Sequence, residues 1–271
     1  MTKEGFRIGG TKGDLFRGAA QDYAIHRHSY PTEVVDRLVQ IGRLSGQERL
    51  LDCGCGTGQV FLPIAEHFLE VVGVDPDSEM LDFAARNIVR EGLSNIVLKQ
   101  MRAEEISSNL GRFHMVVFGA SFHWTDRLKV ANLVYDLLEP GGHLILICYP
   151  GVNTENAPWA FEIQKVVEKH LGTIRRAGSG IYIPGERHEE ILNRSSFAGT
   201  VKTGEIEILE NWEVDRIIGW LFSSSCSSRE ILQDRSKVFE SDIRRAVKPF
   251  VVDGVIQRKV KYTLIAACRE K

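Results

Sequence analysis

The sequence lacks several features that mark other classes of protein. Its five cysteines include no CxxC pair, so neither a zinc ribbon nor a redox motif is indicated. No apolar run approaches the roughly 18 to 20 residues that span a bilayer, and the N-terminus has no secretory apolar core. We therefore expect reduced cysteines, a cytoplasmic location and no membrane partner.

An excess of charge of one sign is also absent. The 34 Lys and Arg residues face 36 Asp and Glu residues, which gives a formal net charge of -2. A nonspecific nucleic-acid binder carries a basic excess, so we expect no nucleic-acid partner. Cys53 and Cys55 have no second ligand pair, so we expect no metal site.

Short β-rich runs alternate with amphipathic stretches between residues 48 and 149. This alternation is typical of βαβ units, which build a doubly wound parallel sheet in the α/β class. The helical spacing of apolar residues and the flanking Gly and Pro residues set the expected bounds. We predict strands over 48–54, 70–75, 95–101, 113–120 and 141–149, and helices over 59–68, 78–92 and 126–140.

The later part of the chain has a different pattern. Helices are expected over 158–171 and 213–223, an alternating strand over 202–210, and a last strand over 260–270. Ligands of open α/β sheets bind at the carboxyl ends of the strands, so we assign 150–236 to a substrate cap over that edge. The expected division is a helical cover (1–45), a ligand-binding core (46–149), this cap, and a C-terminal helix and strand (237–271) that complete the core.

A glycine-rich turn follows the first predicted strand in the sequence LLDCGCGTGQ. Gly54, Gly56 and Gly58 allow positive φ and close approach of a ligand to the backbone. A nicotinamide dinucleotide site is disfavoured because its GxGxxG pattern needs glycine where this chain has Gln59. Asp75 ends the second predicted strand and can accept both hydroxyls of a ribose, although an Asp-Pro pair also suits a simple turn.

Five segments together resemble class I S-adenosylmethionine-dependent methyltransferases, and more narrowly their small-molecule, type 11-like branch: LLDCGCGTGQ, VVGVDPDSEML, RAEEI, FHMVVFGASFHWTD and LEPGGHLIL. Upstream, FRGAAQDYAIHRHSYP resembles the substrate-covering N-terminal helix of that branch. The resemblance implies a mostly parallel, seven-stranded Rossmann-like sheet with an inserted or appended, mainly helical cap. It also implies S-adenosylmethionine as cofactor and an antiparallel strand over 260–268.

The resemblance also assigns roles to single residues. The glycine turn would surround the methionine moiety, Asp75 would bind the ribose, and others would lie near the adenine. Arg27, through its guanidinium fork, is a candidate for holding the cofactor's carboxylate. The expected cofactor-binding residues are Asp52, Gly54, Cys55, Gly56, Gly58, Asp75, Pro76, Met80, Ala103, Glu104, Ala120 and Arg27.

Candidate catalytic residues lie after the fourth predicted strand and in the N-terminal helix. An imidazole suits a general base, so His123 is the leading candidate, but together with Trp124 it is equally well explained as a wall of the pocket. His28 and Tyr23 are candidates for contact with the substrate. The GASFHW sequence differs from the [DN]PPY signature of base-amino methyltransferases, so a DNA base is not the expected acceptor.

The cap segment is acidic. Residues 150–215 contain 11 acidic and 7 basic residues, a balance of -4, including Glu205, Glu207 and Glu210. Converging carboxylates suit a cationic small molecule, so we expect methylation of an amine nitrogen of a metabolite such as an amino sugar. A solvated strand face explains the same run. Alternatives are methylation of a hydroxyl or carboxylate oxygen and a noncatalytic cofactor-binding protein; we expect a monomer or homodimer.

Overall fold

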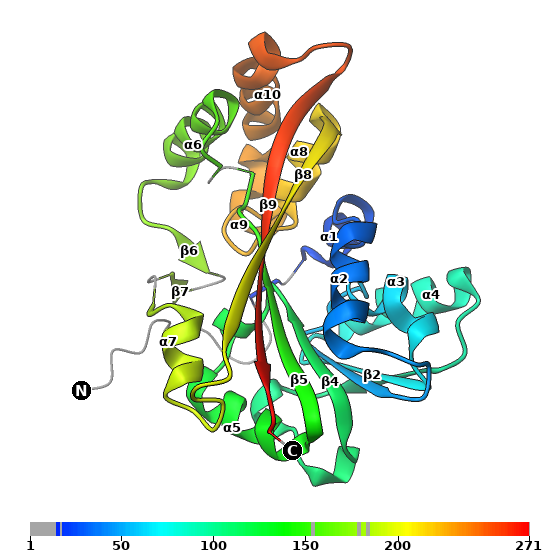
Figure 1. Ribbon diagram of the computed structural model, residues 1–271. Coiled ribbons are helices and arrows are strands. Elements are labelled where there is room, and N and C mark those ends of the chain that lie inside the picture. The colour runs from blue at the N-terminus through cyan, green and yellow to red at the C-terminus, as the bar shows by residue number, and fades with distance from the viewer. Residues whose placement is uncertain (1–14, 17, 153–154, 178–179, 183–184, 271) are drawn as a thin grey trace. The chain divides into compact units, whose positions relative to one another are not determined.

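Figure 1 shows the computed structural model, which describes residues 15–16, 18–152, 155–177, 180–182 and 185–270. The chain divides into two compact units. We call residues 1–28, 149–184 and 207–261 the helical unit, and residues 29–148, 185–206 and 262–271 the sheet unit. None of the described helices is long and apolar enough to cross a membrane.

A seven-stranded sheet runs in the order β3-β2-β1-β4-β5-β9-β8. Neighbouring strands from β3 to β5 are parallel, whereas β9 is antiparallel to β5. The central strands β1 and β4 are almost wholly buried, as a sheet with helices packed on it requires. The predicted fold class is confirmed. The strands are β1 (Arg49–Cys53), β2 (Glu70–Asp75), β3 (Ile96–Gln100), β4 (Phe113–Gly119), β5 (Leu138–Cys148), β8 (Lys202–Glu213) and β9 (Val255–Cys268).

The helices of the sheet unit largely follow the predicted periodicity. The helix expected over 59–68 begins only at Phe61, because Pro63 has no N–H to donate to the carbonyl of Gln59. After Ile64, α3 gives way to a 3-10 turn over Ala65–His67. The helix expected over 126–140 ends at Leu137, where β5 begins at once. The helices are α2 (Thr32–Gly42), α3 (Phe61–Ile64), α4 (Ser78–Glu91), α5 (Arg127–Leu137) and α7 (His188–Asn193).

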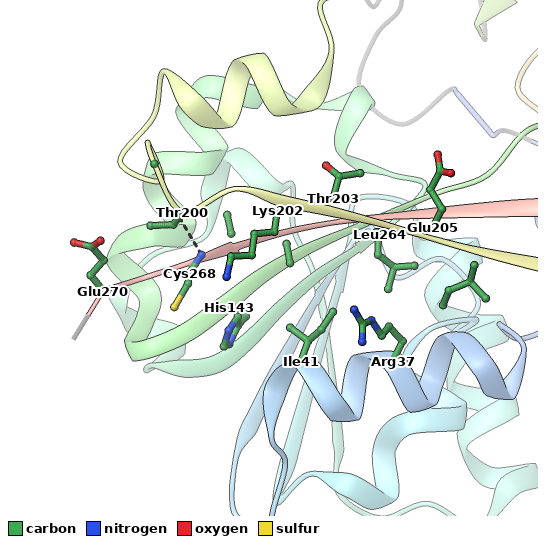
Figure 2. A pocket seen from close by; sticks show the side chains of 15 residues that line it. Arg37, Ile41, His143, Thr200, Lys202, Thr203, Glu205, Leu264, Cys268 and Glu270 are labelled. Carbon is green, nitrogen blue, oxygen red and sulfur yellow. Dashed lines mark hydrogen bonds between the residues drawn. The ribbon is translucent and has the colours of Figure 1, made fainter.

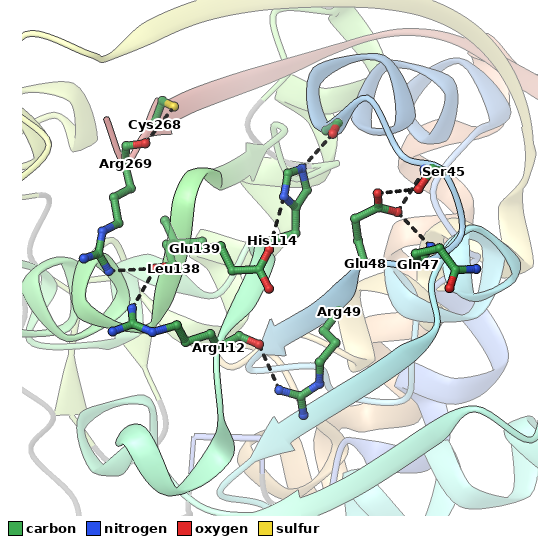
Figure 3. A network of polar contacts seen from close by, with 11 residues as sticks. Ser45, Gln47, Glu48, Arg49, Arg112, His114, Leu138, Glu139, Cys268 and Arg269 are labelled. Atoms are coloured by element: carbon green, nitrogen blue, oxygen red, sulfur yellow. Dashed lines mark hydrogen bonds and ion pairs between the residues drawn. The ribbon is translucent and has the colours of Figure 1, made fainter. Parts of the chain in front are cut away.

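Arginines close the end of the sheet at which β1 begins (Figure 3). Arg49 donates to the carbonyl of Arg112 at 2.8 Å, and Arg112 donates to the carbonyl of Leu138 at 3.1 Å. Arg269 reaches the same Leu138 carbonyl at 2.7 Å. These bonds satisfy main-chain acceptors at strand ends. They lie at the opposite end of β1 from the glycine turn, so they stabilise the scaffold and leave the turn free for other contacts.

The helical unit has its own apolar core. Phe239 of α10 lies 5.9 Å from Phe222 of α8 and 5.5 Å from His170 of α6, measured between ring centroids. Asp242 of α10 pairs with Lys169 and His170 of α6. The elements are α1 (Ala20–His26), α6 (Pro158–Leu171), β6 (Arg176–Ala177), β7 (Gly180–Ile181), α8 (Val214–Phe222), α9 (Arg229–Leu232) and α10 (Ser236–Val247).

Two parts of the expected domain division differ from the structure. The strand expected in the cap is the edge strand β8 of the main sheet, next to β9, and has residues in both units. The helix expected to complete the core, α10, packs on α6 in the helical unit. Both have one apolar face, and that pattern requires burial without specifying the neighbour.

Truncation of Phe239 tests the core of the helical unit. We expect Phe239→Ala to lower the free energy of unfolding by about 3–5 kcal/mol, because the buried ring leaves a cavity between α6, α8 and α10. Val89→Ala is the control, since Val89 is 81% exposed and its truncation should change stability by less than about 0.5 kcal/mol. Urea unfolding followed by circular dichroism measures both; equal values would show that Phe239 is not a core residue.

Candidate functional site

The glycine turn connects β1 to α3 in a conformation that needs glycine. The φ angles of Gly54, Gly56 and Gly58 are 68°, 55° and 102°, in the left-handed region. A Cβ at Gly54 would lie 2.6 Å from the Cβ of Ser121. The N–H groups of Gly54 and Cys55 both donate to the carbonyl of Val74, which fixes the turn against the end of β2. The turn is therefore preformed by the protein.

Asp52 lies completely buried at the end of β1. Within the described residues neither oxygen of its carboxyl group accepts a hydrogen bond of ordinary geometry. Burial, and secondly the negative charge of Asp75, raise the pKa of Asp52 to about 8, and the Phe61 N–H opposes this shift. An unsatisfied buried carboxyl group costs free energy, which a ligand with donors or positive charge would recover.

Asp75 ends β2 and is 8% exposed. Its two carboxylate oxygens accept from the N–H groups of Gly56 and Asp77, each at 2.9 Å. Burial raises the pKa of Asp75 to about 6, against the opposing effect of these two N–H groups. Asp77 then caps α4 by accepting from the N–H groups of Glu79 and Met80. Asp75 therefore joins the glycine turn to the start of α4.

The residues expected near the adenine belong to the sheet unit. Met80 on α4 and Ala103 are buried, whereas Pro76 is exposed. Glu104 accepts from the N–H of Asp126 at 2.9 Å and lies 3.4 Å from the Nε of Arg102. The carboxylate of Glu104 thus has a structural task at the start of α5, and contact with an adenine is an additional role that we propose for it.

The end of β4 has a strained backbone. Ala120 has a φ of 53°, which costs free energy for a residue with a Cβ and is often found at functional sites. Ser121 donates to the carbonyl of Cys53 at 2.6 Å and so ties this segment to the glycine turn. His123 and Trp124 follow on a 3-10 turn, with ring centroids 4.3 Å apart. The two rings are tilted by 43° to each other, and both the wall role and the base role of His123 stay predictions.

The candidates of the N-terminal helix belong to the helical unit. Arg27 donates to Ser223 at 2.8 Å and to Tyr149 at 3.2 Å, and its guanidinium lies over the rings of Trp220 and Tyr23. Partial burial, and secondly the charge of Arg216, lower the pKa of His28. Arg27 therefore has several partners within its own unit; the cofactor and substrate roles of Arg27, Tyr23 and His28 stay predictions.

The acidic run along β8 is largely paired. Glu207 forms an ion pair with Lys259, Asp215 with Arg244, and Glu210 accepts from the indole of Trp212. Glu205 and Glu207 are exposed, in the alternating pattern of an edge strand. This arrangement fits a solvated strand face better than a cluster of converging carboxylates.

Sequence reasoning missed the role of Ser121. Its hydroxyl bonds a residue 68 positions away, and its Cβ lies where a side chain at Gly54 would be. Tyr30 is similar, since its N–H donates to the carbonyl of Gln59 and its hydroxyl lies against Gly119. No local pattern signals either contact. Among the residues that the structure describes, no group of three His, Cys, Asp or Glu side chains is placed to hold a metal ion.

Comparison with known proteins agrees with this geometry. Residues 50–142 match the family model described as "Methyltransferase domain". An uncharacterized methyltransferase of Mycobacterium tuberculosis is 31% identical over 160 residues, and juvenile hormone acid O-methyltransferase of Drosophila melanogaster is 28% identical over 170 residues. These alignments cover 59% and 57% of this chain. The chain spans about three fifths of the length of these relatives, 61% and 56%.

A solved structure shows the same fold. Phosphoethanolamine N-methyltransferase 2 of Haemonchus contortus, in complex with phosphomonomethylethanolamine and S-adenosylhomocysteine, has a TM-score of 0.52 and 18% identity. The match covers 93% of this chain and 57% of that one. Residues 50–142 are therefore similar to a methyltransferase domain, and the predicted resemblance to class I S-adenosylmethionine-dependent methyltransferases, with its cofactor class, is confirmed.

The residues present fit this cofactor. S-adenosylmethionine carries ribose hydroxyls, an ammonium group and a sulfonium charge. The carboxyl groups of Asp52 and Asp75 beside the turn are desolvated, and no cation of the protein contributes to the pKa shift of either group. Hydroxyl donors and positive charge both favour ionised carboxylates. The glycines provide backbone that a ligand can approach closely.

The buried carboxyl group of Asp52 makes stability depend on pH. The folded protein holds its proton up to about pH 8, whereas the unfolded chain releases it near pH 4, so this group lowers stability as pH rises between those values. Without cofactor, we expect Asp52→Asn to gain stability relative to the wild type by up to about 1.4 kcal/mol per pH unit, levelling off above pH 8. Urea unfolding from pH 5 to 9 measures this; Asp82→Asn, at an exposed position, is the control, and a flat difference for Asp52→Asn would contradict the shift.

Asp75 can be tested through cofactor affinity. We expect Asp75→Ala to weaken binding of S-adenosylhomocysteine by about 1–3 kcal/mol, because charge-assisted bonds to ribose hydroxyls are lost. Isothermal titration gives the dissociation constant, with Asp82→Ala on the exposed face of α4 as the control. An unchanged constant for Asp75→Ala would refute its role in binding the ribose.

Proposed function

We propose that this chain transfers the methyl group of S-adenosylmethionine to a small molecule. The observation that carries the proposal is the preformed glycine turn with Asp52 and Asp75 buried beside it, within a methyltransferase domain. The helical unit adds a separately packed set of polar and aromatic residues suited to recognising an acceptor, including Arg27, Tyr149 and Trp220. The proposal includes a cytoplasmic location and a monomer or homodimer as the active form.

The chemistry sets modest demands on the protein. The bound cofactor supplies an electrophilic methyl carbon, and displacement at that carbon needs an acceptor aligned with the breaking bond. Alignment can lower the barrier by about 7–11 kcal/mol. In this proposal Asp75 holds the ribose hydroxyls, Asp52 and the glycine turn hold the methionine part, and Arg27 is a candidate for its carboxylate. His123 either accepts the proton of the acceptor or, with Trp124, excludes water from the site.

The charges of the helical unit and the name of one relative bear on the class of acceptor. The amine nitrogen was expected from the acidic cap and the histidines, and in the structure Glu207 and Asp215 form ion pairs. The Drosophila relative is named for methylation of an acid. We therefore place a carboxylate or hydroxyl oxygen first and an amine nitrogen of a cationic metabolite second. A carboxylate is ionised at pH 7 and needs no base, whereas an ammonium must first lose a proton.

The experiment that tests the proposal has two stages. Isothermal titration with S-adenosylmethionine and S-adenosylhomocysteine should show one site per chain; no binding would overturn the proposal. Release of S-adenosylhomocysteine is then measured across matched acids, alcohols and amines that share a carbon skeleton. Turnover with the acid alone supports the order given above, and turnover with the amine alone reverses it. Binding without turnover across the panel would favour the noncatalytic alternative.

Replacement of His123 separates its two possible roles. If His123 is the base, His123→Asn should lower kcat by about 10²–10⁴-fold with an alcohol or amine acceptor and leave cofactor affinity unchanged. A carboxylate acceptor should be much less affected, because it carries no proton to remove. Turnover and S-adenosylhomocysteine titration measure the two effects. Parallel loss of cofactor binding would identify His123 as a wall of the pocket.

A further inference from the structure

A groove with a volume of about 750 Å³ lies over strands β5, β9 and β8, beside helix α2 (Figure 2). Every residue that lines it belongs to the sheet unit. None belongs to the glycine turn, and neither Asp52 nor Asp75 is among them. The volume falls within the range of roughly 300–1,000 Å³ that is usual for small-molecule sites. The groove is thus a second place on this unit where a ligand fits.

Gly204 on β8 leaves open space in the middle of the groove. Lys202, Gly204 and Ile206 share one face of β8, because alternate residues of a strand point to the same side. A Cβ built at Gly204 meets no atom within 4 Å, so a side chain there would occupy open space. Leu264 on β9 and Ile41 on α2 provide apolar walls. The middle of the groove is therefore apolar and open.

Positive charges flank this apolar middle. Within the described residues the ammonium of Lys202 makes no hydrogen bond or ion pair, and Arg37 bonds only the neutral side chain of Gln40, at 3.3 Å. Figure 2 shows the carboxylate of Glu205 on the other side of β8, and Glu270 beyond Cys268 at the end of the groove where Lys202 lies. Both carboxylates belong to the lining, and neither forms an ion pair with Lys202 or Arg37 among the described residues.

His143 on β5 supplies a polar atom without a partner. It lies directly opposite Cys268 in the antiparallel ladder, so both side chains share the face of the groove. Its Nδ1 is buried and has no hydrogen-bond partner in the part of the chain that the structure describes. Burial, and secondly His114 and Arg43, lower the pKa of His143 and keep the ring neutral at pH 7. A ring nitrogen of a neutral imidazole can accept a hydrogen bond from a ligand or donate one to it, depending on the tautomer.

We propose that this groove binds a small organic anion with a linear apolar body, of the class of medium-chain carboxylates. Lys202 and His143 would hold the carboxylate, and the chain would lie along Leu264 and Ile41 toward Arg37. Charge complementarity favours this occupant, because neither Lys202 nor Arg37 forms an ion pair among the described residues and the walls between them are apolar. The site is separate from the proposed cofactor site, so the inference does not depend on methyl transfer.

Titration with decanoate, below its micelle concentration and in the presence of S-adenosylhomocysteine, tests the proposal on the full chain. We expect one site, with a chemical-shift change at the Gly204 amide in the NMR spectrum. Decyltrimethylammonium has the same chain and the opposite charge, and it should bind at least about tenfold more weakly. Equal binding of the two probes, or shift changes elsewhere only, would overturn the proposal.

Two variants locate the site. Lys202→Gln should weaken decanoate binding by about tenfold, because a charge-assisted bond is lost. Lys99→Gln, at an exposed position on β3, is the matched control and should leave it unchanged. Gly204→Val should abolish binding by filling the groove, and a melting temperature no lower than that of the wild type shows that it folds. Unchanged affinity in both groove variants would overturn the proposal whether or not the chain binds S-adenosylhomocysteine.

Discussion

Burial of two carboxyl groups at the ends of β1 and β2 is the constraint on which the site depends. Asp52 is fully buried without a hydrogen bond of ordinary geometry among the described residues, and Asp75 is buried with only main-chain donors. Each carboxyl group loses its hydration on folding, and hydrogen bonds within the protein replace that hydration only in part. The buried carboxyl groups therefore lower the stability of the fold. The left-handed glycines and the Val74 carbonyl hold the turn in place despite this cost, which leaves it shaped for a ligand that brings donors and positive charge.

Most of the sheet could be predicted because local sequence patterns indicate its strands. Buried runs of apolar residues alternate with helical periodicity from β1 to β5, and the right-handed crossover of βαβ units leaves only a few arrangements of them. The positions of β8 and α10 could not be predicted in this way. Each has one apolar face. Such a face must pack against another element, but the sequence pattern does not tell whether that element is the sheet or a helix. The shortened helix at Pro63 was readable from the sequence, since proline removes a donor.

The candidate site divides in the same way. The glycine turn and the acid at the end of β2 follow from spacing along the chain, and the family match agrees with them. The contacts of Ser121, the strained φ of Ala120 and the missing partners of Asp52 join residues far apart in sequence, so no local pattern contains them. The acidic run was the weakest guide to function. Its carboxylates suggest a binding surface, but Glu207 on β8 pairs with Lys259 and Asp215 on α8 pairs with Arg244.

Strands β8 and β9 each begin in one unit and end in the other, and the chain passes between the units five times, after His28, Cys148, Pro184, Ile206 and Lys261. Neither unit is a continuous piece of sequence. A single genetic crossover therefore cannot exchange the helical unit for that of a relative while leaving both strands whole. Under the proposed function, new acceptor preferences would arise by point substitutions within the helical unit, and grafting experiments would have to replace several segments together.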